Sequence, residues 1–183
     1  MLVALYIGDH AKDTLSVRLG WWLTKTLQKG PYGDVTHCEA IHALHDDGTV
    51  TIASASLRDG GVRSKVTDLT PGNWRVVDVP MWDVAHSIDL LALTKGQPYD
   101  LRGAIATVLP GCPQQGHWFC NAWVARPYLK ASSSFGPNHF AAICFSFGRD
   151  ITAEFFAERS ARKPQPSAGN SFVSGITPSF SKG

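Results

Sequence analysis

Residues 116–125 read GHWFCNAWVA and are the most informative stretch of the chain, because they set Cys120 behind a loop rich in Gly, Pro and Gln and at the start of an apolar, helix-favouring run. At a helix start, the first backbone N–H groups and the positive end of the helix dipole favour a thiolate over a thiol. The same N–H groups are donors for an oxyanion. The stretch therefore makes Cys120 a candidate nucleophile.

A second signal lies far upstream, in the strand-like residues 35–41, VTHCEAI. A cysteine nucleophile needs a nearby imidazole as base and a polar group that fixes the imidazole tautomer. In a strand, His37 and Glu39 share one face, whereas Cys38 lies on the other and is expected to point away from the group that His37 serves. Together, Cys120 and His37 predict a cysteine hydrolase.

Hydrophobic periodicity predicts a chain in which helices and strands are interspersed. The expected helices span residues 14–27, 82–95, 97–108, 120–130 and 153–162, and the expected strands span 2–7, 35–44, 50–56 and 73–79. The RDGGVR segment at 58–63 predicts a polar glycine loop, and Pro127 is expected to bend or end the helix that Cys120 begins.

The strands at 35–44 and 50–56 are expected to form a hairpin. A four-residue turn at 45–48 would place His37 opposite Ser56 and Glu39 opposite Ser54, and a change of one residue in the turn would shift both pairs. Glu39, Ser54 and Ser56 are therefore the candidates for the group that orients the imidazole.

Size and composition predict one domain over residues 1–162 and a flexible tail rich in Ser, Gly and Pro over 163–183. The 183 residues are 44% hydrophobic and carry a net charge of +2 without a block of like charge, which argues against a nucleic-acid partner. The four cysteines lack the CxxC pairs and the density of a disulfide scaffold, so reduced thiols are expected.

The N-terminal residues are apolar but lack a basic n-region, so no signal peptide is predicted and the chain is expected to be cytoplasmic as synthesised. No apolar run reaches the roughly 18 residues that a membrane span needs. Neither a metal nor a cofactor is predicted, because the sequence has no HExxH, no paired CxxC, no P-loop and no GxGxxG.

The order of the motifs resembles a known family. A Thr-His-x-Glu strand, an Arg-Asp-Gly-Gly-Val-Arg loop, a Tyr-Asp helix start and a Phe-Cys-x-x-Trp-Val-Ala helix follow one another. This order is similar to the circularly permuted branch of the NlpC-type, papain-like cysteine hydrolases, which includes YiiX-like, lecithin retinol acyltransferase-like and phage-type proteins. The resemblance spans roughly residues 2–130. It implies a papain-like α+β fold, with an antiparallel sheet packed against helices.

The resemblance also implies roles for single residues. In that branch the histidine strand precedes the cysteine helix, which makes Cys120 the nucleophile and His37 the base. YiiX-like members carry a glutamate near the end of the second hairpin strand, where this chain has ASAS at 53–56. Ser54, Ser56 or Glu39 takes that role, or catalysis is weak or lost.

Three further side chains are candidates for substrate contacts. Gln114 precedes Cys120 closely enough for its amide to reach an oxyanion, as a glutamine does in papain-like enzymes, although an ordinary polar loop also explains it. Arg58 and Arg63 are candidates for binding an anionic substrate group, with a solvated glycine turn as the alternative.

The expected reaction is hydrolysis of an amide bond of the cell-wall peptide or N-acyl amino acid type. The expected partners are thus a peptide, a peptidoglycan fragment or an acyl-amide, in a phage or bacterial setting that includes association with a virion. Two alternatives stay open. One is a catalytically weak or inactive papain-like binding or virion-associated module, and the other is an acyltransferase that uses the same dyad.

Overall fold

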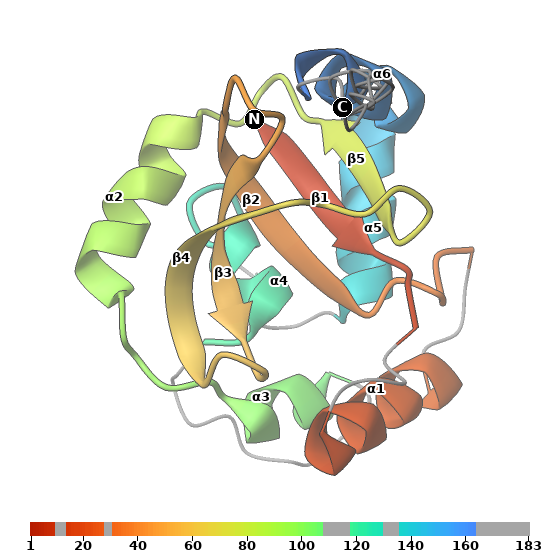
Figure 1. Ribbon diagram of the computed structural model, residues 1–183. Coiled ribbons are helices and arrows are strands. Elements are labelled where there is room, and N and C mark those ends of the chain that lie inside the picture. Colours follow the sequence, from red (N-terminus) through yellow and green to blue (C-terminus); the bar gives the residue numbers. More distant parts are fainter. Residues whose placement is uncertain (10–13, 28–30, 108–117, 130–135, 164–183) are drawn as a thin grey trace, which may run out of the picture.

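The computed structural model describes residues 1–9, 14–27, 31–107, 118–129 and 136–163, which form one six-stranded sheet with flanking helices (Figure 1). The strands pair antiparallel in the order β4-β3-β2-β1-β5-β6. They are β1 (Leu2–Tyr6), β2 (His37–Leu44), β3 (Val50–Ser56), β4 (Gly61–Thr67), β5 (Trp74–Asp78) and β6 (Arg149–Asp150). The helices are α1 (Leu15–Leu27), α2 (Val84–Thr94), α3 (Leu101–Ala106), α4 (Cys120–Ala125), α5 (Pro137–Phe147) and α6 (Thr152–Arg162). The predicted α+β class with an antiparallel sheet against helices is confirmed.

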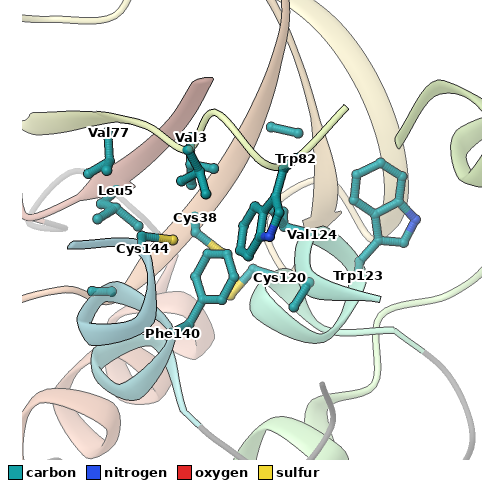
Figure 2. Packing of buried hydrophobic residues seen from close by; sticks show 14 of the residues in the cluster. Val3, Leu5, Cys38, Val77, Trp82, Cys120, Trp123, Val124, Phe140 and Cys144 are labelled. Atoms are coloured by element: carbon teal, nitrogen blue, oxygen red, sulfur yellow. The ribbon is translucent and has the colours of Figure 1, made fainter. Parts of the chain in front are cut away.

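Side chains alternate between the two faces of the sheet along each strand, and each face carries its own apolar cluster. Helices α2, α4 and α5 pack on one face, where Val3, Leu5 and Cys38 join the larger core cluster (Figure 2). On the other face Ile41 and neighbouring apolar side chains form a smaller cluster with α6. In Figure 1, α1 and α3 lie at the end of the sheet where β3 ends and β4 begins.

The hairpin between β2 and β3 differs from the predicted register. His45 N–H donates to the Thr49 carbonyl at 2.9 Å, so the loop has three residues rather than four, and its last residue is Gly48 at φ 79°. Such loops need a residue in the left-handed region, which glycine adopts without steric cost.

A bulge at His42 then corrects the register by one residue. Leu44 pairs with Val50, whereas Ile41 pairs with Ile52, and the ladder ends at the pair of Ala40 with Ala53. The bulge turns the His42 imidazole toward α2, where it lies 2.9 Å from the Ser87 hydroxyl. His37 and Glu39 therefore lie beyond the β2–β3 ladder and are not paired with Ser56 and Ser54 as predicted.

Strand β4 overlaps the polar glycine loop predicted at 58–63, and its other residues lie outside the predicted strands. Its side chains Arg63 and Lys65 alternate with Val62 and Val66, and Val66 is exposed, so the apolar alternation of a half-buried strand is weak. Backbone pairing with β3 over its whole length holds it at the sheet edge.

The ends of two helices can be compared with the prediction. Helix α4 ends at Ala125, two residues before Pro127, which has no N–H to continue the helical hydrogen bonds, although Arg126 between them is still helical at φ −51° and ψ −42°. Lys163, placed at the start of the predicted tail, instead follows α6 directly and pairs with Asp68 at 2.6 Å. The rest of that tail lies outside the described residues.

Two further expectations can be compared with the described residues. Cys38, Cys120 and Cys144 are free thiols. A search of the described helices finds none with the length and apolarity to cross a membrane.

Buried Arg159 ties α6 to two loops. Its guanidinium donates to the carbonyls of Gly48 at 2.6 Å and Leu69 at 2.7 Å and pairs with Asp68. Replacement by Ala should destabilise the protein by on the order of 3 kcal/mol, because two buried carbonyls lose their donors and the packing of the buried guanidinium is lost, whereas the pair with half-exposed Asp68 adds little. Urea unfolding measures this change.

The matched control is Arg162→Ala on the same helix. Arg162 is 33% exposed, against 3% for Arg159, and pairs with Glu158 one turn away. An exposed pair of this kind contributes about 0.5 kcal/mol. Equal losses of unfolding free energy in Arg159→Ala and Arg162→Ala would contradict the stabilising role of the Arg159 contacts.

Candidate active site

His37 and Glu39 meet at the beginning of β2. Because strand side chains alternate, residues two apart share a face, and His37 Nε2 lies 2.7 Å from Glu39 Oε1. The Glu39 residue is only 1% exposed, whereas the His37 side chain is 21% exposed. A buried carboxylate thus holds one nitrogen of a partly accessible imidazole.

Arg63 reaches the same carboxylate from β4. Its Nη1 donates to Glu39 Oε2 at 2.6 Å and its Nη2 to Oε1 at 2.5 Å, while its Nε donates to Asp59 at 2.7 Å. Arg63 pairs with Ser54 of the intervening strand β3, and the small serine leaves room for the guanidinium to cross. Arg63 was predicted to bind an anionic group of a substrate. In the structure its donors instead face the carboxylates of Glu39 and Asp59.

Cys120 is the first residue of α4, as the sequence predicts. Phe119 before it is extended, at φ −122° and ψ 167°, and Asp100 N–H donates to the Trp118 carbonyl at 2.8 Å, which fixes the entry into the helix. Trp123 is fully buried in the core and donates from Nε1 to Thr94 of α2 at 2.9 Å. The helix therefore presents Cys120, 3% exposed, to the sheet.

The sulfur of Cys120 interacts with both His37 and Cys38. A side-chain hydrogen bond and an electrostatic attraction link it to His37, and the thiol and backbone N–H of Cys38 also bond to it. Figure 2 shows Cys38 and Cys120 side by side in the core. The prediction that Cys38 points away from the group served by His37 is wrong, because Cys120 contacts both residues at the end of the β2–β3 ladder.

These contacts shift three pKa values in a consistent direction. Burial alone would lower the pKa of His37, but the charge of Glu39, followed by Cys120, outweighs it and raises this pKa to about 9. Burial would raise the pKa of Glu39, but His37 and Arg63 lower it to about 2. The hydrogen bond from Cys38, followed by the charge of His37, lowers the pKa of the Cys120 thiol well below its usual range despite burial. The site thus favours thiolate, imidazolium and carboxylate together.

A pocket of about 450 Å³ opens beside this group, between the sheet, α1 and α3. His37, Glu39 and Arg63 line it, as does Tyr99 just before α3. Burial raises the pKa of the Tyr99 phenol, which therefore stays an O–H donor. Cys120 is not among the described residues that line this pocket.

The other predicted site residues lie as follows. Ser54 is fully buried and its hydroxyl donates to the Ala55 carbonyl at 3.2 Å, and the Ser56 hydroxyl accepts from Asp59 N–H at 3.3 Å. These hydroxyl bonds lie within β3 and its turn. Arg58 is exposed and lines the pocket. Gln114 lies outside the described residues.

Sequence reasoning missed Cys38 and Tyr99 as neighbours of Cys120. Tyr99 is part of the Tyr-Asp helix start, whereas no sequence signal marks Cys38, because its contact depends on where the β2–β3 ladder ends. Among the described residues no cluster of three His, Cys, Asp or Glu side chains is arranged to hold a metal ion.

The titration of His37 provides a test of the ionic contacts. We expect an NMR titration to give an imidazole pKa near 9 in the native protein, and Glu39→Gln to lower it, because burial then acts without the opposing charge. A pKa near 6.5 in both proteins would contradict the ion pair.

The raised pKa of His37 should also make the free energy of unfolding depend on pH. A pKa raised on folding adds stability that is fully present below the unfolded pKa of about 6.5 and is lost as the pH rises through about 9. The lowered pKa of the Cys120 thiol acts in the opposite direction up to about pH 8.5. In a Cys120→Ser background, urea unfolding across this range should therefore show stability falling with pH, and a weaker fall when Glu39→Gln is added.

Comparison with known proteins identifies no relative: no protein-family model matches the chain, and neither a curated protein nor a solved structure is significantly similar to it.

Proposed function

We propose that the protein is a cysteine hydrolase that cleaves an amide bond, with Cys120 as nucleophile and His37 as base. The observation that carries the proposal is the chain of contacts from the Cys120 sulfur through His37 to the buried Glu39 carboxylate. Nucleophile, base and orienting group in this order are the arrangement that activates a thiol.

In this proposal each imidazole nitrogen has its own role. Nε2 is held by Glu39 at 2.7 Å, which leaves Nδ1 as the nitrogen that exchanges a proton with Cys120. Glu39 thereby takes the orienting role for which Ser54 and Ser56 were the other candidates.

In the first half of the reaction the Cys120 thiolate attacks the carbonyl carbon and forms a C–S bond. The oxyanion is stabilised by the backbone N–H of Cys120, which has no partner inside α4 because it is the first residue of that helix. The amide C–N bond then breaks, and the leaving nitrogen takes the proton held on the His37 imidazolium.

In the second half His37 removes a proton from water, which attacks the thioester carbon. The C–S bond breaks, the acid product departs and the Cys120 thiolate is restored beside the imidazolium. The two halves together consume the amide and one water, and no further co-reactant is needed.

The resemblance noted in the sequence supports a papain-like, circularly permuted NlpC-type fold and the proposed substrates. These are amides of cell-wall peptides or N-acyl amino acids. The order of β2 before α4, and the antiparallel sheet against α4, agree with that resemblance.

An acyl-enzyme is the direct test. Incubation with p-nitrophenyl acetate, and with a panel of peptidoglycan peptides and N-acyl amino acids, should give a mass adduct on Cys120. The adduct should be absent from Cys120→Ala, strongly slowed in His37→Ala and unchanged in Cys144→Ala, because burial in the core raises the pKa of the Cys144 thiol and keeps it protonated.

Product analysis then separates the alternatives. Release of free acid in water indicates a hydrolase, whereas transfer to an added amine in preference to water indicates an acyltransferase with the same dyad. No Cys120 adduct with any probe would overturn the proposal and favour a binding module.

A further inference from the structure

The contacts of Arg63 exceed what a surface ion pair needs. Its guanidinium comes from β4, crosses β3 and makes two hydrogen bonds to Glu39, one to Asp59 and one to the Ser54 carbonyl, the last at 3.3 Å. Glu39 is a carboxylate that is almost fully buried, and burial of such a group without a partner favours its neutral form.

The protonation state of Glu39 decides which nitrogen of His37 carries the proton. An ionised Glu39 is an acceptor only, so Nε2 must donate to it and Nδ1 is free to accept a proton from Cys120. A protonated Glu39 would donate its own O–H to Nε2, and the neutral imidazole would then carry its proton on Nδ1. That second tautomer cannot act as the base toward Cys120.

We propose that Arg63 is a positioning residue, which acts through Glu39 to hold His37 in the tautomer that accepts the proton of Cys120. The inference rests on the proposed function, and it assigns Arg63 to the machinery of the site rather than to substrate binding. Arg63 touches neither Cys120 nor His37 through any contact described above, so its effect passes through the carboxylate.

The turn before β4 supports this role. Asp59 accepts from Arg63 Nε at 2.7 Å and from Lys65 at 3.1 Å, which fixes the guanidinium from its other side. Gly60 in the turn has φ 80°, and a Cβ on Gly61 would lie 2.1 Å from the Gln97 carbonyl oxygen. The RDGGVR segment therefore has a structural reason for its glycines and its second arginine.

Several charged or titratable groups surround Glu39 and influence its protonation. They are His37 and His42 on its own strand, Cys38 behind it, Arg63 on β4, Asp59 in the turn with its partner Lys65, and Cys120 on α4 beside His37. Of these, Arg63 is the cation that bonds to both carboxylate oxygens.

The experiment is the pH profile of Cys120 alkylation by iodoacetamide, read by mass spectrometry in a double-mutant cycle of Arg63→Gln and Glu39→Gln. Arg63→Gln should move the acid limb of the profile up by about one pH unit, so that labelling near pH 5 slows about tenfold. In the Glu39→Gln background the same substitution should change the rate less than about twofold, because the carboxylate through which it acts is absent.

Arg75→Gln is the matched control. Arg75 also pairs a guanidinium with a carboxylate on this sheet, at 2.7 Å from Asp150 on β6, but lies outside the site. It should leave the limb unchanged. Arg63→Lys keeps the charge but has fewer donors, so the acid limb of its alkylation profile should lie between those of the native protein and Arg63→Gln.

Equal shifts by Arg63→Gln in both backgrounds, or no shift in the native background, would overturn the inference. If Arg63→Gln does not fold, Asp59→Asn takes its place in the cycle with the same expected sign, because it loosens the guanidinium. Failure of the proposed function has a different signature: native Cys120 would then label slowly below about pH 8 and His37→Ala would not change it.

Discussion

The buried charge of Glu39 is the constraint on which the arrangement of the site depends. A carboxylate that is 1% exposed must be compensated by cations or hydrogen bonds, and here His37 and Arg63 supply both. These two residues come from the strands on either side of β3, so the burial of a single charge links the register of β2, β3 and β4. Removing one partner leaves the carboxylate uncompensated.

The second requirement is that a helix start meets the end of a strand ladder. Backbone pairing of β2 with β3 ends at Ala40 and Ala53, which leaves the backbone N–H of Cys38 available to the Cys120 sulfur. The apolar residues of α4, above all Trp123, bury that helix against α2 and the sheet. Packing in the core therefore sets the position of the sulfur, whereas polar contacts at the pocket set the imidazole.

The sequence predicts much of this from local pattern. Strands β1, β2, β3 and β5, the helix start at Cys120 and the shared face of His37 and Glu39 follow from periodicity and from the position of apolar residues. Strand β4 could not be predicted with the same rule, since its charged residues face carboxylates of the site and its Val66 is exposed. Backbone pairing with β3, rather than an apolar pattern of its own, holds β4 in the sheet.

The remaining differences arise from contacts that are distant in sequence. The three-residue loop and the bulge at His42 compensate each other, so the assumed register holds at Ile41 and Ala40 although the turn was assigned wrongly. The approach of Cys38 to Cys120, and the commitment of Arg63 to Glu39, depend on how three strands and α4 pack, which neither motif nor periodicity encodes.

The central claim is that Cys120 is a thiolate paired with the imidazolium of His37 near neutral pH. Ultraviolet absorbance of the thiolate, titrated in the native protein, Cys120→Ser and His37→Ala, measures it directly. We expect one thiolate in the native protein at about pH 6, which is absent from Cys120→Ser and is lost in His37→Ala. Thiolate absorbance that appears in all three proteins only near the ordinary cysteine pKa of about 8.5 would contradict it.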